Sequence, residues 1–381
     1  MNLGFGTQEL WHSGTFLKMD FNYKKITVKI GSNVLTKTDG TLNVARIAHL
    51  VDQIALLHKN GVEIILVSSG AVAAGRGELK HTKKLDTVSS RQLWSAVGQV
   101  KLINRYAGFF SGHDIHCAQV LTTKDNFADR THYLNMKNCF STLLENKVVP
   151  IVNENDTISV TELMFTDNDE LSGLIASMQN SEALIILSNI EGIYDGDPSS
   201  PDSRIIEEIS VRDRDWMQHV SLQKSGFGRG GMLTKSTIAR KVAREGIAVH
   251  IASGLHDNVL VDIMRKDSFV KHTLFKPEKH KSSNVKKWIA YSESFAKGKL
   301  VINEGAKAAL FATRASSLLP IGVVAVRGIF QKDDIVKIMD EQEKLIGWGR
   351  SRLSSEKAEK ERGSKNQRPI VHYDYLYLIE D

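Results

Sequence analysis

Cysteine is scarce in this sequence of 381 residues, which contains only Cys117 and Cys139. Two thiols cannot build a disulfide framework or a four-cysteine zinc site. The 13 histidines show no H-E-x-x-H pattern or other paired metal spacing, so a zinc site is not expected. The sequence therefore predicts reduced thiols in a soluble, cytoplasmic protein.

Long apolar runs are missing as well. No run approaches the roughly 18 apolar residues that a membrane-spanning helix requires. Residues 1–18 also lack the continuous apolar core of a signal peptide. They are interpreted as a tail, or as an upstream start ahead of Met19, and no membrane partner is expected.

The familiar phosphate-binding motifs are absent or out of context. No G-x-x-x-x-G-K-[ST] stretch occurs, which excludes a Walker-type nucleotide binder. One G-x-G-x-x-G pattern, at Gly226, Gly228 and Gly231, follows the polar segment 212–225 instead of a strand, so a Rossmann site lacks its context. Two interpretations stay open: a surface loop, or a phosphate loop that opens a helix near Gly231. In the second case Lys235 adds a full charge one turn later.

The net charge of +6 is unevenly distributed. Residues 1–275 carry 30 Lys and Arg against 30 Asp and Glu, whereas residues 276–381 carry 20 against 14. A basic module of this kind is compatible with nucleic-acid binding and also with a solvated surface. The hydrophobic content of 41% is enough for a large core, and the length predicts two or three domains.

From Lys25 onward, short β-branched runs alternate with longer helical stretches. The expected strands are 25–30, 62–70, 115–122, 148–156, 183–189 and 247–254, the second of which runs into a Gly/Ala loop. The expected helices are 42–61, 89–110, 134–147, 171–181 and 231–246. Near-continuous apolar strands separated by helices predict an α/β fold, with a mostly parallel sheet sandwiched by helices.

Polar clusters follow four of these strands, at 31–33, 68–70, 153–156 and 188–189. Ligands of parallel sheets bind beyond the carboxyl ends of the strands, so the four clusters indicate a single site. Lys29 lies just before Gly31, where a glycine lets a ligand approach the backbone closely. Together with Ser69 and Lys235, these features suit a polyanionic substrate.

The segment FTDNDELSG (165–173) is rich in acid, since Asp167 and Asp169 flank Asn168 just before a helix. One such acid suffices to cap a helix, at a gain of about 1 kcal/mol. Two acids and an amide in front of Glu170 favour a function beyond capping. DGDP (195–198), in contrast, is typical of a turn.

The pattern changes after residue 275. Residues 276–288 form a basic linker without periodicity, and short β-like runs follow at 288–292, 299–303, 321–330, 334–340, 344–349 and 370–379. They predict a small all-β module, a partly closed barrel. The expected division is an N-terminal extension (1–24), a larger domain (25–275), and a linker with the β-module (276–381).

In this order, the segments closely resemble the amino acid kinase family. The matching segments are VKIGSNVL (28–35), VSSGAVAAGR (67–76), AVGQ (96–99), VVPIVNENDT (148–157), FTDNDELS (165–172), GIYDGDP (192–198) and SGFGRGGMLTK (225–235). Residues 302–310 and 316–330 are similar to a PUA domain. The resemblance covers residues 25–381, and its specificity lies in the ordered set.

The resemblance implies ATP-dependent phosphorylation of the γ-carboxylate of L-glutamate, the first step of proline biosynthesis. The chemistry agrees with the residues, because a carboxylate with a pKa near ~4.3 is already ionised at pH 7 and needs no general base. The obstacle is repulsion between the anionic acceptor and the γ-phosphate. Positive charge, backbone donors and alignment overcome it.

The resemblance also implies roles for single residues. Lys29 matches the lysine that neutralises the transferring phosphoryl group from the acceptor side, and Lys235 matches the lysine on the nucleotide side. Asp169 matches the acid that orients both lysines, with Asp167 beside it. The implied ATP-binding positions are Lys29, Ser188, Asn189, Arg229, Gly230, Gly231, Met232, Leu233, Thr234 and Lys235. Mg²⁺ is expected to bridge the ATP phosphates, largely through water and without direct protein ligands.

The implied glutamate-binding positions are Ser69, Asp156 and Asn168, supported by Asn153. Asp156 is expected to pair with the α-ammonium group, and the amide of Asn168 to serve the α-carboxylate. The family further implies proline as a feedback inhibitor and a homo-oligomer, either a dimer or a tetramer.

Three positions depart from the family pattern. Ser188-Asn189 stands where relatives commonly have Thr-Asp, which removes one negative charge. Arg229 stands where a threonine is frequent and makes the glycine loop more basic. The segment 351–370 is short and highly charged, which predicts a trimmed barrel there.

Two alternatives stay open. One is another member of the family, acting on acetylglutamate, aspartate, carbamate or a nucleotide, although residues 153–156 with 167–169 favour free glutamate. The other is an RNA-binding protein with an inactive kinase-like domain, suggested by the basic module. The presence of both lysines and both acids favours an active enzyme, so RNA is the less favoured partner.

Overall fold

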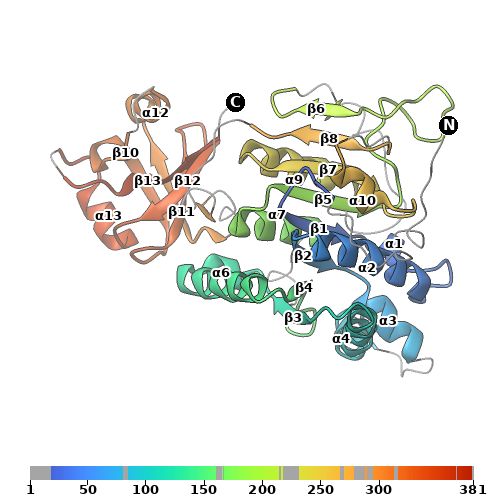
Figure 1. Cartoon of the computed structure of the whole chain (residues 1–381). Helices are drawn as coiled ribbons and strands as arrows, with labels where there is room; N and C mark the ends of the chain where they lie inside the picture. The colour runs from blue at the N-terminus through green and yellow to red at the C-terminus, as the bar shows by residue number, and fades with distance from the viewer. Residues whose placement is uncertain are drawn as a thin grey trace. The chain divides into compact units, whose positions relative to one another are not determined.

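The computed structural model describes residues 19–79, 85–159, 165, 167–213, 216–217, 231–266, 270–278, 288–289, 295–312, 316–365 and 367–379. The chain divides into two compact units (Figure 1). The first comprises Met1–Asn126 with Thr131–Lys281, and the second Phe127–Arg130 with Ser282–Asp381. Within the described ranges, no helix is both long and apolar enough to cross a membrane.

The first unit contains an eight-stranded sheet with the order β3-β4-β2-β1-β5-β7-β8-β6. Its strands are β1 (Lys25–Ile30), β2 (Glu63–Ser68), β3 (Cys117–Thr122), β4 (Val149–Glu154), β5 (Ala183–Ser188), β6 (Glu208–Ser210), β7 (Ala248–Ser253) and β8 (Thr273–Lys276). Neighbouring strands from β3 to β7 are parallel, β8 is antiparallel to β7, and β6 is parallel to β8. All six predicted strands are present, and the mostly parallel sheet is confirmed.

Helices cover both faces of this sheet (Figure 1). The helices described in residues 19–266 are α1 (Ser32–Leu35), α2 (Val44–Lys59), α3 (Ala71–Glu78), α4 (Thr87–Ser111), α5 (Asp125–Ala128), α6 (Arg130–Glu145), α7 (Asn168–Gln179), α9 (Met232–Arg244) and α10 (Val259–Met264). The five predicted helices correspond to α2, α4, α6, α7 and α9. Strand β5 and helix α7 are buried almost throughout, which explains the near-continuous apolar sequence of β5.

The prediction of a Gly/Ala loop after β2 was wrong, because residues 71–78 form α3. A Cβ atom on Gly75 would overlap the carbonyl group of Trp94 in α4, and a Cβ atom on Gly98 would overlap the carbonyl group of Ala71 in α3. The glycines therefore serve a close approach of two helix backbones instead of a flexible loop. Gly70, directly before α3, has a positive φ of 99°.

The second unit contains a five-stranded sheet with the order β10-β9-β11-β12-β13. Its strands are β9 (Gly298–Ile302), β10 (Val323–Gly328), β11 (Ile335–Met339), β12 (Leu345–Ser351) and β13 (Val371–Leu378). The pairings are antiparallel except for that of β9 with β11. Buried residues such as Leu300, Val336 and Ile346 form its core.

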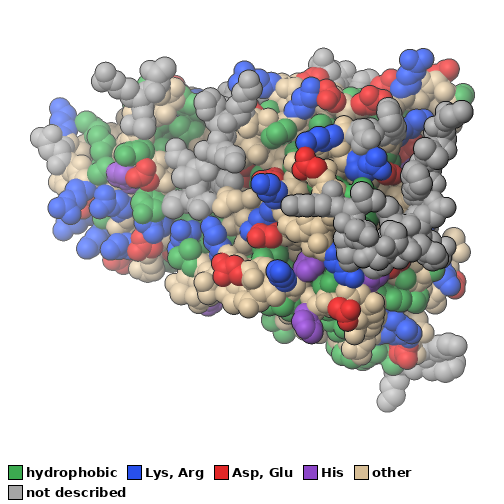
Figure 2. Space-filling view, in the orientation of Figure 1, with side chains coloured by type: hydrophobic (Ala, Val, Ile, Leu, Met, Phe, Trp, Pro, Cys, Tyr) green, Lys and Arg blue, Asp and Glu red, His purple; other side chains and the backbone are tan. Residues whose placement is uncertain are grey.

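The expectation of an all-β module needs correction in two respects. Helices α12 (Glu304–Phe311) and α13 (Ser355–Glu361) interrupt the strands, capped by the side chains of Asn303 and Ser354. Residues 288–289 are helical where a strand was expected. The charged segment 351–370 contains α13, whose buried Ala358 packs into the core. Figure 2 shows Lys and Arg side chains gathered around α13, where Lys357 and Lys360 are exposed.

The α3–α4 contact generates a stability prediction. Gly98→Ala is expected to lower the free energy of unfolding by about 1–3 kcal/mol, because the new methyl group must push the α3 backbone away. Gly108→Ala in the same helix meets no atom within 4 Å and is expected to raise stability by up to about 1 kcal/mol through helix propensity. Urea denaturation followed by circular dichroism measures both changes. Equal effects of the two substitutions would contradict the close approach.

Candidate active site

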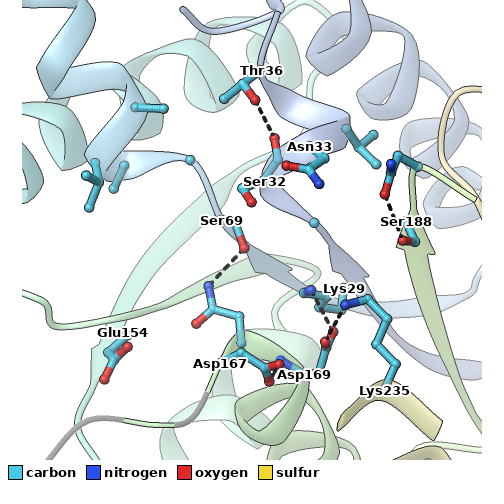
Figure 3. A pocket seen from close by; sticks show the side chains of 18 of the residues that line it. Lys29, Ser32, Asn33, Thr36, Ser69, Glu154, Asp167, Asp169, Ser188 and Lys235 are labelled. Carbon is cyan, nitrogen blue, oxygen red and sulfur yellow. Dashed lines mark hydrogen bonds and ion pairs between the residues drawn. The ribbon is translucent and has the colours of Figure 1, made fainter. Parts of the chain in front are cut away.

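A pocket of about 1290 Å³ lies at the carboxyl ends of β1, β2, β4 and β5 (Figure 3). Strands β1 and β5 are neighbours in the sheet although β2, β3 and β4 lie between them in the chain. The pocket therefore occupies a point where the strand order reverses, the usual ligand site of open α/β sheets. All four polar strand ends contribute to the lining, including Gly31, Ser69, Asn153 and Ser188.

A buried carboxylate holds two lysines at the centre of the pocket (Figure 3). Lys29 Nζ lies 2.6 Å from Asp169 Oδ1, and Lys235 Nζ lies 3.0 Å from Asp169 Oδ2. The side chain of Asp169 is 0% exposed, and those of the lysines are 6% and 10% exposed. The three residues come from β1, α7 and α9, so the fold brings together side chains that are far apart in sequence. Two cations around one anion leave this group of three residues with a net positive charge.

Local structure explains how the two lysines reach the pocket. Lys29 is the penultimate residue of β1, and the N–H of Gly31 then donates to the carbonyl oxygen of Leu187 in β5 at 2.9 Å. A Cβ atom on Gly31 would lie 3.1 Å from that same oxygen, so a larger residue would crowd the strand end. Lys235 lies in the first turn of α9, and its N–H donates to the carbonyl oxygen of the N-cap Gly231.

Asp167 is the N-cap of α7, as the capping interpretation predicts. Its Oδ1 accepts the N–H groups of Asp169 at 2.9 Å and Glu170 at 3.1 Å. Burial, together with the charge of Asp169, raises the pKa of Asp167 to about 6. Burial also acts to raise the pKa of Asp169, but the charges of Lys29 and Lys235 outweigh it and hold that pKa below its usual range. The pKa values of these two neighbouring carboxyl groups are thus shifted in opposite directions.

Asn168 links three segments at the rim of the pocket. Its Nδ2 donates to the carbonyl oxygen of Ser68 at 3.1 Å, to Ser69 Oγ at 3.1 Å and to Asn153 Oδ1 at 3.0 Å. Ser69, Asn153 and Asn168 are therefore one hydrogen-bonded group, as their expected shared role requires. The amide donors of Asn168 are engaged by the protein itself.

Asp156 has a partner that the sequence did not reveal. Its Oδ1 accepts from both Nε and Nη2 of Arg91, which lies in the first turns of α4. Arg91 Nη2 also lies 3.6 Å from Glu154 Oε2. No local motif connects Arg91 with a strand end 65 positions away, so only the three-dimensional fold shows the pair.

Glu154 is buried beside this pair and has a structural role. Its Oε1 accepts from Ser159 Oγ and from the N–H of Phe165, each at 2.9 Å. Burial raises the pKa of Glu154. The residue thus anchors the chain segment that follows β4.

The residues expected on the nucleotide side lie at the end of β5 and at the start of α9. Ser188, Asn189 and Met232 line the pocket, and Ser188 Oγ donates to Asn189 Oδ1 at 3.4 Å. Gly231 is the N-cap of α9, which continues through Leu233 and Thr234 to Lys235. Arg229 and Gly230 lie outside the described residues.

The turn containing DGDP was not expected near the site, yet Gly196, Asp197, Pro198 and Ser199 line the pocket. Asp197 Oδ1 accepts from the N–H and Oγ of Ser199 at 2.9 and 2.6 Å, so the segment is the turn that its composition indicates. Nothing in its sequence distinguishes a pocket-lining turn from a surface one.

Comparison with known proteins agrees with this geometry. The model of the amino acid kinase family matches residues 24–253, and that of the PUA domain matches residues 298–373. The chain therefore belongs to the amino acid kinase family.

Two individual relatives have names that are more specific than the name of the family. The chain is 57% identical to a glutamate 5-kinase of Bacteroides thetaiotaomicron, over 94% of this chain and 100% of that one. It is 49% identical to a glutamate 5-kinase of Chlorobaculum tepidum, over 94% of this chain and 98% of that one. Among solved structures, a UMP kinase from Bacillus anthracis is similar at a TM-score of 0.48 and 16% identity, covering 67% of this chain and 97% of that one.

The raised pKa of Asp167 generates a prediction about stability and pH. The pKa of an unfolded Asp is near ~3.9, so ionised Asp167 disfavours the folded state, and this cost sets in as the pH rises from about 4 through the folded pKa of about 6. Asp167→Asn keeps an N-cap acceptor but cannot ionise. The free energy of unfolding of the Asp167→Asn variant minus that of the wild type is expected to increase by on the order of 2–3 kcal/mol as the pH rises from 4 to 7.

Urea denaturation at several pH values measures this difference. Asp86→Asn is the control, because Asp86 caps α4 in the same way but its hydrogen bonds with Ser89 lower its pKa. That variant is expected to gain no stability over the same interval. A constant difference between Asp167→Asn and the wild type would contradict the prediction.

Proposed function

We propose that this chain is a glutamate 5-kinase, which transfers the γ-phosphoryl group of ATP to the γ-carboxylate of L-glutamate. A carboxylate oxygen forms a bond to the γ-phosphorus while the bond to the β,γ-bridging oxygen breaks. The products are L-glutamyl 5-phosphate and ADP, the first step of proline biosynthesis. The observation that carries the proposal is the Lys29–Asp169–Lys235 group in the pocket, in a chain 57% identical to a glutamate 5-kinase.

The chemistry needs charge neutralisation more than proton transfer. The acceptor is already ionised near neutral pH, so repulsion between two anions is the main barrier. Lys29 acts on the acceptor side of the transferring group, and Lys235 acts on the nucleotide side. Because Asp169 contacts both Nζ atoms before substrate arrives, the cations need little reorganisation during the reaction. The lowered pKa of Asp169 keeps it ionised for this task.

ATP would occupy the side of the pocket formed by β5 and α9. The N-cap of α9 is a glycine, which has no side chain to accept the first backbone N–H groups, and these groups suit phosphate oxygens. The proposed contacts are Ser188, Asn189 and Arg229 through Lys235. The described residues contain no group of three or more His, Cys, Asp or Glu placed to hold a metal ion. Mg²⁺ would arrive with the phosphates and supply further charge neutralisation.

Glutamate would occupy the opposite side, formed by β2 and β4. Ser69 and Asn168, supported by Asn153, would bind its polar groups, and Asp156 would bind its α-ammonium group. Asp167 lies beside this subsite and holds the start of α7 in place.

Further features of the proposal concern the enzyme as a whole. Proline would act as a feedback inhibitor, the enzyme would be a dimer or a tetramer in the cytoplasm, and the domain division at residue 275 would separate catalysis from the PUA module. RNA binding by the PUA module stays a prediction that is less favoured than the enzymatic function.

A turnover assay tests the function directly. ADP release by the purified protein with Mg·ATP is expected to require L-glutamate and to fall when proline is added. Aspartate and N-acetylglutamate are expected not to replace L-glutamate. Turnover that depends on one of those two, with none on glutamate, would overturn the proposal.

Lys235→Ala is expected to lower kcat by about 10²–10³-fold, because one preorganised cation facing the transferring phosphoryl group is lost. Lys241→Ala, near the other end of α9, removes the same charge and is the matched control. Steady-state kinetics at saturating ATP and glutamate measure both, and thermal unfolding verifies that each variant is folded. A folded Lys235→Ala variant with near-normal turnover would refute the assigned role.

A further inference from the structure

We infer that Arg91 and Asp156 together recognise the zwitterionic end of the substrate, with Asp156 binding the α-ammonium group and Arg91 the α-carboxylate. The inference rests on the proposed function and adds a specificity-determining residue to it. The pair lies at the glutamate side of the pocket, where both residues contribute to the lining.

Arg91 forms its hydrogen bonds with only one of the two carboxylate oxygens of Asp156. Nε and Nη2 of Arg91 both donate to Oδ1 of Asp156. The part of the chain that the structure describes places no donor on Oδ2. Asp156 therefore keeps one carboxylate oxygen for a ligand while the other fixes its orientation. An ammonium group is the natural partner of such an oxygen.

The position of the α-carboxylate follows from covalent structure. The ammonium and carboxylate groups of an α-amino acid share one carbon atom, so the cation that binds the carboxylate must lie next to the anion that binds the ammonium. Arg91 meets this condition because it contacts Asp156 directly. Arg76 also lines the pocket, but it is exposed and no contact joins it to Asp156. Lys29 and Lys235 are held by Asp169.

Asn168 is the less suitable partner for the α-carboxylate. Its Nδ2 already donates to three protein oxygens, on Ser68, Ser69 and Asn153. Binding a carboxylate there would break contacts that join α7 to β2 and β4. The amide thus organises the subsite, and the guanidinium supplies the charge.

Charge balance gives the pair its selectivity. The α-end of glutamate adds one positive and one negative charge, so binding of the zwitterion leaves unchanged the net charge of Arg91, Asp156 and the neighbouring Glu154. An analogue that lacks one of the two charges leaves an unbalanced charge at a site where Asp156 is 7% exposed. Such unbalanced burial is costly.

The test compares three acceptors at concentrations below KM, where the rate gives kcat/KM. L-glutamate carries both charges, its 1-amide (isoglutamine) lacks the α-carboxylate charge, and glutarate lacks the ammonium group. Arg91→Gln is expected to lower kcat/KM for L-glutamate by about 10- to 100-fold, mainly through KM for glutamate. KM for ATP is expected to stay unchanged. The effect on isoglutamine is expected to be less than threefold, so the preference for glutamate over its amide disappears.

Two further variants make the test specific. Asp156→Asn is expected to abolish the preference for glutamate over glutarate instead. Arg91→Lys retains the charge and is expected to restore part of the preference over isoglutamine, which also protects the test should Arg91→Gln fold poorly.

The outcomes separate the competing explanations. If Arg91 only positions Asp156, Arg91→Gln lowers kcat/KM for glutamate and isoglutamine equally, and the inference is overturned. Loss of the preference over isoglutamine in Arg76→Gln, but not in Arg91→Gln, would overturn it as well. A wild-type protein without glutamate-dependent turnover would instead refute the proposed function.

Discussion

The site depends on one buried carboxylate. Asp169 is completely buried, and an ionised carboxylate in that position is costly unless cations compensate it. Lys29 supplies the compensation from strand β1 and Lys235 from helix α9. The arrangement is not a favourable way to stabilise a fold, since apolar side chains would fill the same space at lower cost. Its geometry is explained by the pocket, where two fixed cations can act on an anionic substrate.

The packing of helix α3 against helix α4 determines the geometry of the side of the pocket that contains Ser69, Arg91 and Asp156. Helix α3 begins directly after Ser69-Gly70, and α4 carries Arg91 toward Asp156. The two helices are held at backbone contact by Gly75 and Gly98, so the position of Arg91 relative to Ser69 depends on the absence of two Cβ atoms. A densely packed interior transmits small changes of this kind over the length of a helix.

Much of this architecture could be predicted from sequence, because apolar periodicity is a strong signal. Six strands and five helices follow from it, and their polar ends indicate the position of the pocket. The helix α3 was missed because the glycines that permit close packing also suggest a loop. Strands β6 and β8 are too short, at 3 and 4 residues, to show a period. The Arg91–Asp156 pair joins residues 65 positions apart, and no local pattern encodes such a contact.

The carboxylate of Asp169 contacts the ammonium groups of both Lys29 and Lys235. The positions of these two side chains, one on each side of the pocket, are therefore linked through a single residue. A displacement of the start of α9 that moves Lys235 also pulls on Asp169, and through it on Lys29 at the end of β1. In the proposed reaction, nucleotide and acceptor would therefore not be positioned independently. On the proposed function, occupancy of one side of the pocket would then change the affinity of the other side for its ligand.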